Sequence, residues 1–220
     1  MSFWTGRVMR RLRPGVAATL ANRENYARAW ATENERVSAG AGPLWVVLGD
    51  STAQGIGASA YDRGYVGQLR QRLDARDGRT WRVVNLSRTG AHVTDVLAAQ
   101  LPALDRYRGA ELVTCTVGAN DLVRARFATV PGTFRLLIGR LPPGAVLATL
   151  PQGLGRKRAE QVNAIIRAEA PPAGLRVADV WARTGPPWKG KFAADDFHPN
   201  ELGYRDWCDA FAEAAGVSVA

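Results

Sequence analysis

Residues 44–55, LWVVLGDSTAQG, place an apolar run directly before a serine flanked by small residues. The run at 44–48 contains only hydrophobic side chains, which is typical of a strand buried on both faces of a sheet. Ser51 follows this strand almost at once, so its hydroxyl is expected at the strand's carboxyl end. On its own the pattern has two interpretations, a nucleophile or, more commonly, the N-cap of a helix.

Four further apolar runs predict the other strands of the sheet. They lie at 81–85, 111–117, 145–150 and 176–180. Apolar side chains also recur every three or four positions, as on one face of a helix, at 65–73, 93–104 and 204–211. Strands that alternate with helices predict an α/β fold of three layers, with a five-stranded parallel sheet between the helices. Reactive groups in such sheets gather at the carboxyl ends of the strands.

Two residues follow the second and third predicted strands at the edge of the sheet where Ser51 is expected. Gly90 has no side chain, so its backbone N–H can come close to a ligand. Asn120 can offer its side-chain NH₂ group to an oxyanion that develops during a reaction. Taken singly, each has an ordinary alternative, because loops commonly contain glycine and turns or helix caps commonly contain asparagine.

The segment 195–200, DDFHPN, precedes the last helical segment and carries one of the two histidines of the chain. A histidine three residues after a carboxylate can donate its Nδ1 proton to that carboxylate, which fixes the tautomer and supports the imidazolium. Asp195 and His198 have this spacing. His92 has no carboxylate at a comparable position before it, so we favour His198 as a general base.

In their order along the chain, GDS at 49–51, the loop glycine, GAND at 118–121 and DDFH at 195–198 together resemble the SGNH (GDSL-like) hydrolase superfamily. The resemblance covers residues from about 44 to 215 and implies a flavodoxin-like α/β/α sandwich with serine esterase activity. One departure is visible, because Thr52 stands where the GDSL string has leucine. No metal or cofactor is implied, and no cluster of His and Cys in the sequence suggests one.

The resemblance assigns a role to each of five residues. It implies Ser51 as the nucleophile, His198 as the general base and Asp195 as the carboxylate that orients the histidine. The oxyanion hole would comprise the backbone N–H groups of Ser51 and Gly90 with the side chain of Asn120. The reaction implied is acyl transfer at an ester through a covalent intermediate.

The substrate is left open between a lipid ester and an acylated carbohydrate. Residues expected to border it are Asp50, His92, Arg124 and Phe127. Basic residues at 156–158 would attract an anionic substrate, or they are simply the solvated start of a helix. Two alternatives to the esterase remain, an acyltransferase that passes the acyl group to a sugar or lipid hydroxyl and a non-catalytic binding module.

A second motif competes for the region after Ser51. Residues 55–60, GIGASA, match the GxGxxA form of a dinucleotide-binding fingerprint. That motif begins immediately at the end of a strand, whereas residues 50–54 intervene here, and the second predicted strand ends in Asn85 where an acidic residue is needed. We interpret the match as a coincidence.

Residues 1–40 precede the first strand, and we expect a basic, helical extension distinct from a hydrolase domain at 41–220. If residues 4–13 are helical, their apolar side chains share one face, and Pro14-Gly15 would end the helix. One hypothesis is that residues 1–16 contact a membrane surface, and the alternative is that they pack on the domain or fray. The segment lacks the apolar core and cleavage site of a secretory signal, so we expect a cytoplasmic protein.

Composition excludes several other classes. The net charge of +9 is spread along the chain without interleaved aromatic side chains, which argues against a nucleic-acid partner. No apolar run approaches the ~18 residues of a membrane span. Cys115 and Cys208 are the two cysteines, and the apolar neighbours of Cys115 favour a buried thiol over a disulfide. The expected partner is therefore a small ester, and the sequence does not determine the oligomeric state.

Overall fold

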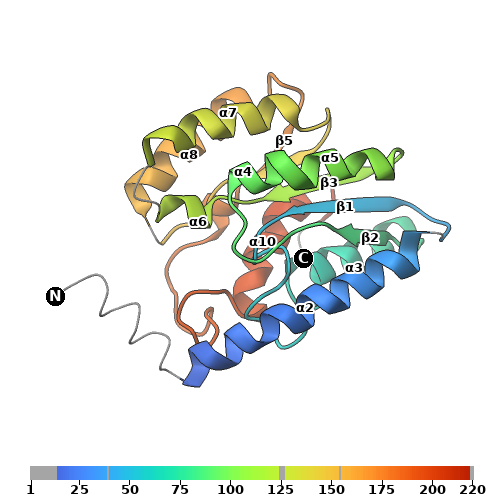
Figure 1. The fold of residues 1–220 in the computed structure, drawn as a ribbon, viewed down its shortest axis with the longest axis horizontal. Coiled ribbons are helices and arrows are strands. Elements are labelled where there is room, and N and C mark those ends of the chain that lie inside the picture. Colours follow the sequence, from blue (N-terminus) through green and yellow to red (C-terminus); the bar gives the residue numbers. More distant parts are fainter. Residues whose placement is uncertain (1–13, 39, 124–126, 154, 219–220) are drawn as a thin grey trace.

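The computed structural model describes residues 14–38, 40–123, 127–153 and 155–218. They form three layers, with one parallel sheet between two layers of helices (Figure 1). The strands are β1 (Leu44–Gly49), β2 (Arg82–Asn85), β3 (Leu112–Thr116), β4 (Val146–Ala148) and β5 (Arg176–Ala178). Their order is β2-β1-β3-β4-β5, and every neighbouring pair is parallel. The predicted five-stranded sheet is confirmed, with strand ends within two residues of those expected.

Helices cover both faces of the sheet (Figure 1). One face carries α4 (Val93–Asp95), a π-helical turn (Val96–Gln100), α5 (Leu101–Ala103), a 3₁₀ turn (Leu104–Tyr107), α7 (Val130–Arg140) and α8 (Arg156–Glu169). The other face carries α3 (Tyr65–Asp77), α9 (Val180–Arg183) and α10 (Glu201–Ala214). The short helix α6 (Ala119–Leu122) follows β3, and a 3₁₀ turn (Phe127–Thr129) precedes α7.

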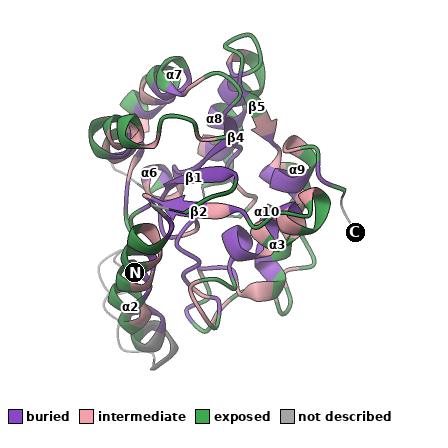
Figure 2. Cartoon of the chain, turned by 90° about the vertical axis from the view of Figure 1, so that its right-hand side faces the viewer, coloured by how far each residue is buried: buried purple, intermediate pink, exposed green. Residues whose placement is uncertain are grey.

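The strands contribute side chains to two hydrophobic cores, one on each face of the sheet, because successive side chains of a strand point to opposite faces. On β1, Val46 and Leu48 belong to the core beneath α7 and α8, whereas Trp45 and Val47 belong to the core beneath α3 and α10. All four side chains are fully buried, which accounts for the uninterrupted apolar run in the sequence. Figure 2 shows the buried strands (purple) enclosed by helices whose outer surfaces are exposed (green).

Helix α2 (Pro14–Ser38) lies along the edge strand β2 (Figure 1). Pro14 and Gly15 are the first two residues described in α2, so the expected end of a preceding helix at this point stays a prediction. The predicted helical face at 4–13, and with it most of the segment assigned to membrane contact, lies outside the described residues.

One side chain of α2 pairs with the backbone at the edge of β2. Asn34 Nδ2 donates to the carbonyl of Asn85 at 2.9 Å, and Asn34 Oδ1 accepts from the Asn85 N–H at 2.8 Å. The amide thus satisfies two backbone groups that a further strand would otherwise pair. No helix within 14–38, 40–123, 127–153 or 155–218 combines the length and apolarity needed to cross a bilayer.

Candidate active site

Ser51 follows the carboxyl end of β1, where Gly49 lets the chain turn close to β3. Gly49 has φ 147°, and a Cβ atom there would collide with the backbone oxygen of Thr116 on β3. The buried side chain of Gln100 accepts from the Gly49 N–H at 2.7 Å and donates to the Gly49 carbonyl at 2.8 Å. The chain therefore turns tightly against β3 just before Ser51, with both backbone groups of the glycine fixed.

Ser51, His198 and Asp195 form a hydrogen-bonded chain although the first lies far from the others in sequence. His198 Nε2 is 3.1 Å from Ser51 Oγ, and His198 Nδ1 is 2.6 Å from Asp195 Oδ2. All three residues are buried, with exposed fractions of 6%, 6% and 7%. In this arrangement His198 can accept a proton from Ser51, and Asp195 can orient the imidazole.

The Asp195 carboxylate is suited to stay ionised beside the imidazole. Burial raises the pKa of Asp195, but hydrogen bonds from the His198 ring and from the backbone N–H groups of His198 and Phe197 outweigh burial and lower it below its usual value. A carboxylate that is anionic at neutral pH can stabilise the imidazolium that forms when His198 takes a proton.

Asn200 fixes the loop that carries Asp195 and His198, and sequence reasoning missed this role. Its Nδ2 group donates to the carbonyls of Gly190 (2.7 Å) and Phe192 (3.1 Å), while its Oδ1 accepts from the Gly203 N–H (3.0 Å) as the N-cap of α10. An asparagine just before a helical segment signals the cap. The two bonds to the loop have no sequence signal, because they depend on how the loop folds back.

Gly57 belongs to the segment 55–60 that matches a dinucleotide fingerprint, and the structure gives a reason for a glycine at this position. It has φ 104°, and a Cβ atom there would lie 2.8 Å from the Cβ of His198. The same Cβ would collide with the carbonyl oxygen of Pro199. The absence of a side chain therefore lets the segment after Ser51 pack directly against the histidine loop.

The residues expected to form an oxyanion hole lie on adjoining segments. Asn120 lies in the first turn of α6, after β3, and its Nδ2 donates to the carbonyl of Ala91 at 3.0 Å, next to Gly90. Gly90 is exposed with φ 81°, a conformation that favours glycine. Within the described residues, the N–H groups of Ser51 and Gly90 form no hydrogen bond, so both can donate to a substrate oxygen. Their catalytic role stays a prediction.

A buried glutamine links the serine turn to the loop that carries Gly90. Gln54 Nε2 donates to the carbonyl of Ser87 at 3.1 Å, and Gln54 Oε1 accepts from the Thr89 N–H at 2.9 Å. Trp30 on α2 donates its indole N–H to the Gln54 carbonyl at 3.2 Å. Helix α2 thus contacts the turn that follows Ser51, which no pattern in residues 1–40 indicated.

The residues predicted to border the substrate lie in different environments. Asp50 is buried and accepts from the Thr52 N–H at 2.9 Å, and burial raises its pKa to about 6. His92 Nδ1 lies 3.4 Å from Asp121 Oδ1. Among the described residues, Asp50, His92 and Phe127 do not line the cavity beside Ser51. Arg124 lies outside the described residues.

The basic residues at 156–158 begin helix α8. Arg158 donates to the carbonyl of Leu122 at 2.6 Å and lies over the ring of Phe127, 4.9 Å from its centroid. Arg156 pairs with Glu160 at 2.9 Å, one turn along the helix. Both arginines thus have protein partners, which favours the second of the two interpretations, the start of a helix.

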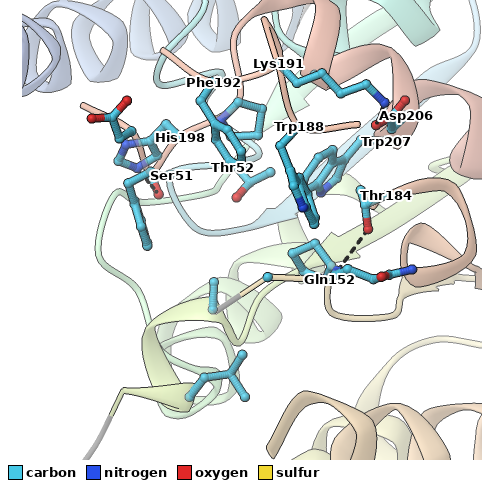
Figure 3. Close-up of a pocket in the computed structure, with 18 of the residues that line it drawn as sticks. Ser51, Thr52, Gln152, Thr184, Trp188, Lys191, Phe192, His198, Asp206 and Trp207 are labelled. Atoms are coloured by element: carbon cyan, nitrogen blue, oxygen red, sulfur yellow. Dashed lines mark hydrogen bonds and ion pairs between the residues drawn. The ribbon is translucent and has the colours of Figure 1, made fainter. Parts of the chain in front are cut away.

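A cavity of about 420 Å³ opens beside Ser51, His198 and Asn120 (Figure 3). Its volume lies within the usual range of small-molecule sites. Trp188, Phe192 and Trp207 line it, and none of these aromatic residues was singled out as a substrate contact in the sequence. In the part of the chain that the structure describes, no group of three or more His, Cys, Asp or Glu residues could hold a metal ion.

Comparisons with known proteins show the family of the chain and proteins of similar fold. The model of the GDSL-like lipase/acylhydrolase family matches residues 47–205. The fold is similar to an acetyl xylan esterase from Geobacillus stearothermophilus (21% identity, TM-score 0.66, covering 83% of this chain and 99% of that one). A lipase/acylhydrolase from Enterococcus faecalis is also similar (20%, 0.63, 80% and 98%). So is an α/β hydrolase from the metagenome of Lake Arreo, Spain (24%, 0.64, 82% and 98%). At these identities the likeness concerns the fold, and no curated protein sequence matches.

Proposed function

The chain belongs to the GDSL-like lipase/acylhydrolase family, and on that premise we propose that it hydrolyses a lipid ester or an acylated carbohydrate through a Ser51 acyl-enzyme. The predicted membership of the SGNH superfamily and the activity class, carboxylic ester hydrolase, are confirmed by the family match. The observation that carries the proposed mechanism is the chain of contacts from Ser51 Oγ through the His198 ring to Asp195 Oδ2.

The first half of the reaction transfers the acyl group to the enzyme. Ser51 Oγ attacks the ester carbonyl while His198 Nε2 accepts the hydroxyl proton, and Asp195 stabilises the imidazolium. The tetrahedral intermediate carries its negative charge on the former carbonyl oxygen, which the Ser51 and Gly90 N–H groups and the Asn120 amide would bind. When the intermediate collapses, His198 returns the proton to the leaving alcohol oxygen, and the ester bond breaks.

The second half regenerates the serine. Water attacks the acyl-enzyme carbonyl and gives a proton to His198, a second tetrahedral intermediate forms, and the acid product leaves as Ser51 Oγ takes the proton back. The site residues supply every proton transfer, so no cofactor enters the cycle. An alcohol acceptor in place of water would give the acyltransferase reaction.

Substitution of Ser51 and of His198 tests the mechanism. With p-nitrophenyl acetate as substrate, we expect Ser51→Ala and His198→Ala to lower kcat by at least about 10³-fold, because nucleophilic and general-base catalysis are removed. Ser59→Ala, at an exposed serine that contacts Glu201, is the matched control and should keep wild-type kcat. Retention of more than a tenth of the activity in Ser51→Ala would refute the acyl-enzyme. Added alcohols that increase product ester at the expense of acid would favour the transferase.

A further inference from the structure

The cavity beside Ser51 has walls of two kinds. Trp188, Phe192 and Trp207 supply aromatic surface, with the first two rings 5.7 Å apart and inclined by 29°. On the side away from Ser51, Lys191 Nζ and Asp206 Oδ2 form an ion pair at 2.8 Å (Figure 3). An occupant must therefore pack against flat aromatic faces and also satisfy a charged pair.

The size of the cavity admits a ring with its substituents. Its volume is about 420 Å³. A benzene ring needs only ~150 Å³, which leaves room here for several substituents.

The polar groups at the far side favour hydroxyl substituents over an alkyl chain. An alkyl chain would remove water from Lys191 and Asp206 without replacing its hydrogen bonds, which is costly. A hydroxyl can donate to the Asp206 carboxylate and accept from the Lys191 ammonium. Gln152 offers a further acceptor, since its Nε2 donates to the Trp181 carbonyl while its Oε1 has no partner among the described residues.

The charges around the cavity do not favour an anionic occupant. The described lining contains one lysine, Lys191, against two aspartates, Asp196 and Asp206. Lys191 is already paired with one of these carboxylates, so the lining offers no excess of positive charge. A neutral polyol matches such a lining better than a phosphate or a free carboxylate does.

The position of the cavity indicates which half of the ester it holds. Trp188, Lys191 and Phe192 belong to the same loop as His198, so the general acid and much of the cavity wall lie on one segment. The leaving oxygen must reach His198 Nε2 to receive its proton. The alcohol attached to that oxygen consequently lies against this loop.

We propose that the cavity binds the alcohol half of the ester and that the part of the alcohol it holds is a sugar ring. The ring packs against Trp188 and Trp207, and its hydroxyl groups bind Lys191 and Asp206. The assignment rests on the proposed function, because it names the substrate of the same Ser51 site. The acyl group lies outside this cavity.

Two acetate esters with the same acyl group and similar rings test the proposal. Monoacetates of methyl pyranosides carry the hydroxyl groups, and cyclohexyl acetate lacks them. Both would form the same acetyl-enzyme, so their kcat/KM values, each divided by the rate of alkaline hydrolysis, compare only the alcohol halves. We expect the wild-type protein to favour the best pyranoside acetate by about tenfold or more, the size of one hydrogen bond to a charged group.

Substitutions of Lys191 and Asp206 test whether this ion pair causes the preference for pyranoside acetates. We expect Asp206→Asn to lower the pyranoside preference at least fivefold, and Lys191→Met to do the same should the first variant not fold. Glu213→Gln is the matched control on the same helix, because its exposed carboxylate pairs with Arg183 away from the cavity. The control should keep the wild-type preference.

The outcomes separate this proposal from the proposed function. Equal or better hydrolysis of cyclohexyl acetate, or a preference that neither Asp206→Asn nor Lys191→Met changes, overturns the sugar assignment. The ester hydrolase then stands. A failure to hydrolyse any pyranoside acetate also overturns the sugar assignment, and if a fluorophosphonate leaves Ser51 unmodified as well, the proposed mechanism falls with it.

Discussion

Replacing Asn200 by serine separates its two structural roles, which are to cap α10 and to fix the loop that carries Asp195 and His198. A serine Oγ can still accept from the Gly203 N–H, but the two bonds from Nδ2 to the Gly190 and Phe192 carbonyls are lost. Two neutral hydrogen bonds contribute about 2 kcal/mol to the free energy of unfolding. His198 lies on the loop so released, and a misplacement of about 1 Å can lower a rate ~10²-fold.

We therefore expect Asn200→Ser to lower kcat for p-nitrophenyl acetate between about tenfold and a hundredfold, with KM changed much less. Asn200→Ala should lose about 1 kcal/mol more in stability than Asn200→Ser, because the cap is lost as well, and should show a similar kcat. Steady-state kinetics with urea unfolding of both variants measures the two effects. Wild-type kcat in Asn200→Ser, at a reduced stability, would refute the view that these bonds position His198.

The remaining predictions concern three other residues. Asn120→Ala should lower kcat by about 10²–10³-fold, and kcat within threefold of wild type would remove Asn120 from the oxyanion hole. Asn34→Ala should lower the free energy of unfolding in urea by about 2 kcal/mol and also lower kcat, because two hydrogen bonds to Asn85, near the Gly90 loop, are lost. Asn25→Ala, at an exposed position on the same helix, is the control. Equal effects of the two substitutions would contradict the reasoning. Burial raises the pKa of Asp50 from its ordinary 3.8 to about 6 in the folded protein. Between about pH 4 and pH 6 the carboxyl therefore ionises in the unfolded chain but not in the folded one, which lowers the free energy of unfolding by roughly 3 kcal/mol. The stability of Asp50→Asn relative to wild type should rise by that amount over this range, and a constant difference would show that burial does not shift the pKa.

The parts of the site that the sequence predicted are those fixed by local spacing. The Asp195–His198 pair is three residues apart within one loop, and Ser51 and Asn120 each follow a strand that an apolar run reveals. Parallel topology then brings the strand ends to one edge without further information. The pattern thus predicts where these residues lie, and the resemblance to the SGNH superfamily supplies the roles expected of them.

The parts that could not be predicted depend on contacts between distant segments. Asn34 meets Asn85, and Gln54 meets Thr89, only after the layers have packed, so neither contact leaves a periodic pattern. The same holds for the cavity wall at Trp188 and Trp207.

The most direct test of the central claim is the rate and position of labelling by a fluorophosphonate, read by intact mass and peptide mapping. We predict one adduct per chain, located on Ser51, with labelling slowed by at least about 10³-fold in His198→Ala. His92→Ala compares the only other histidine and should label at the wild-type rate. An adduct on another residue, or equal rates in the two histidine variants, would contradict the account.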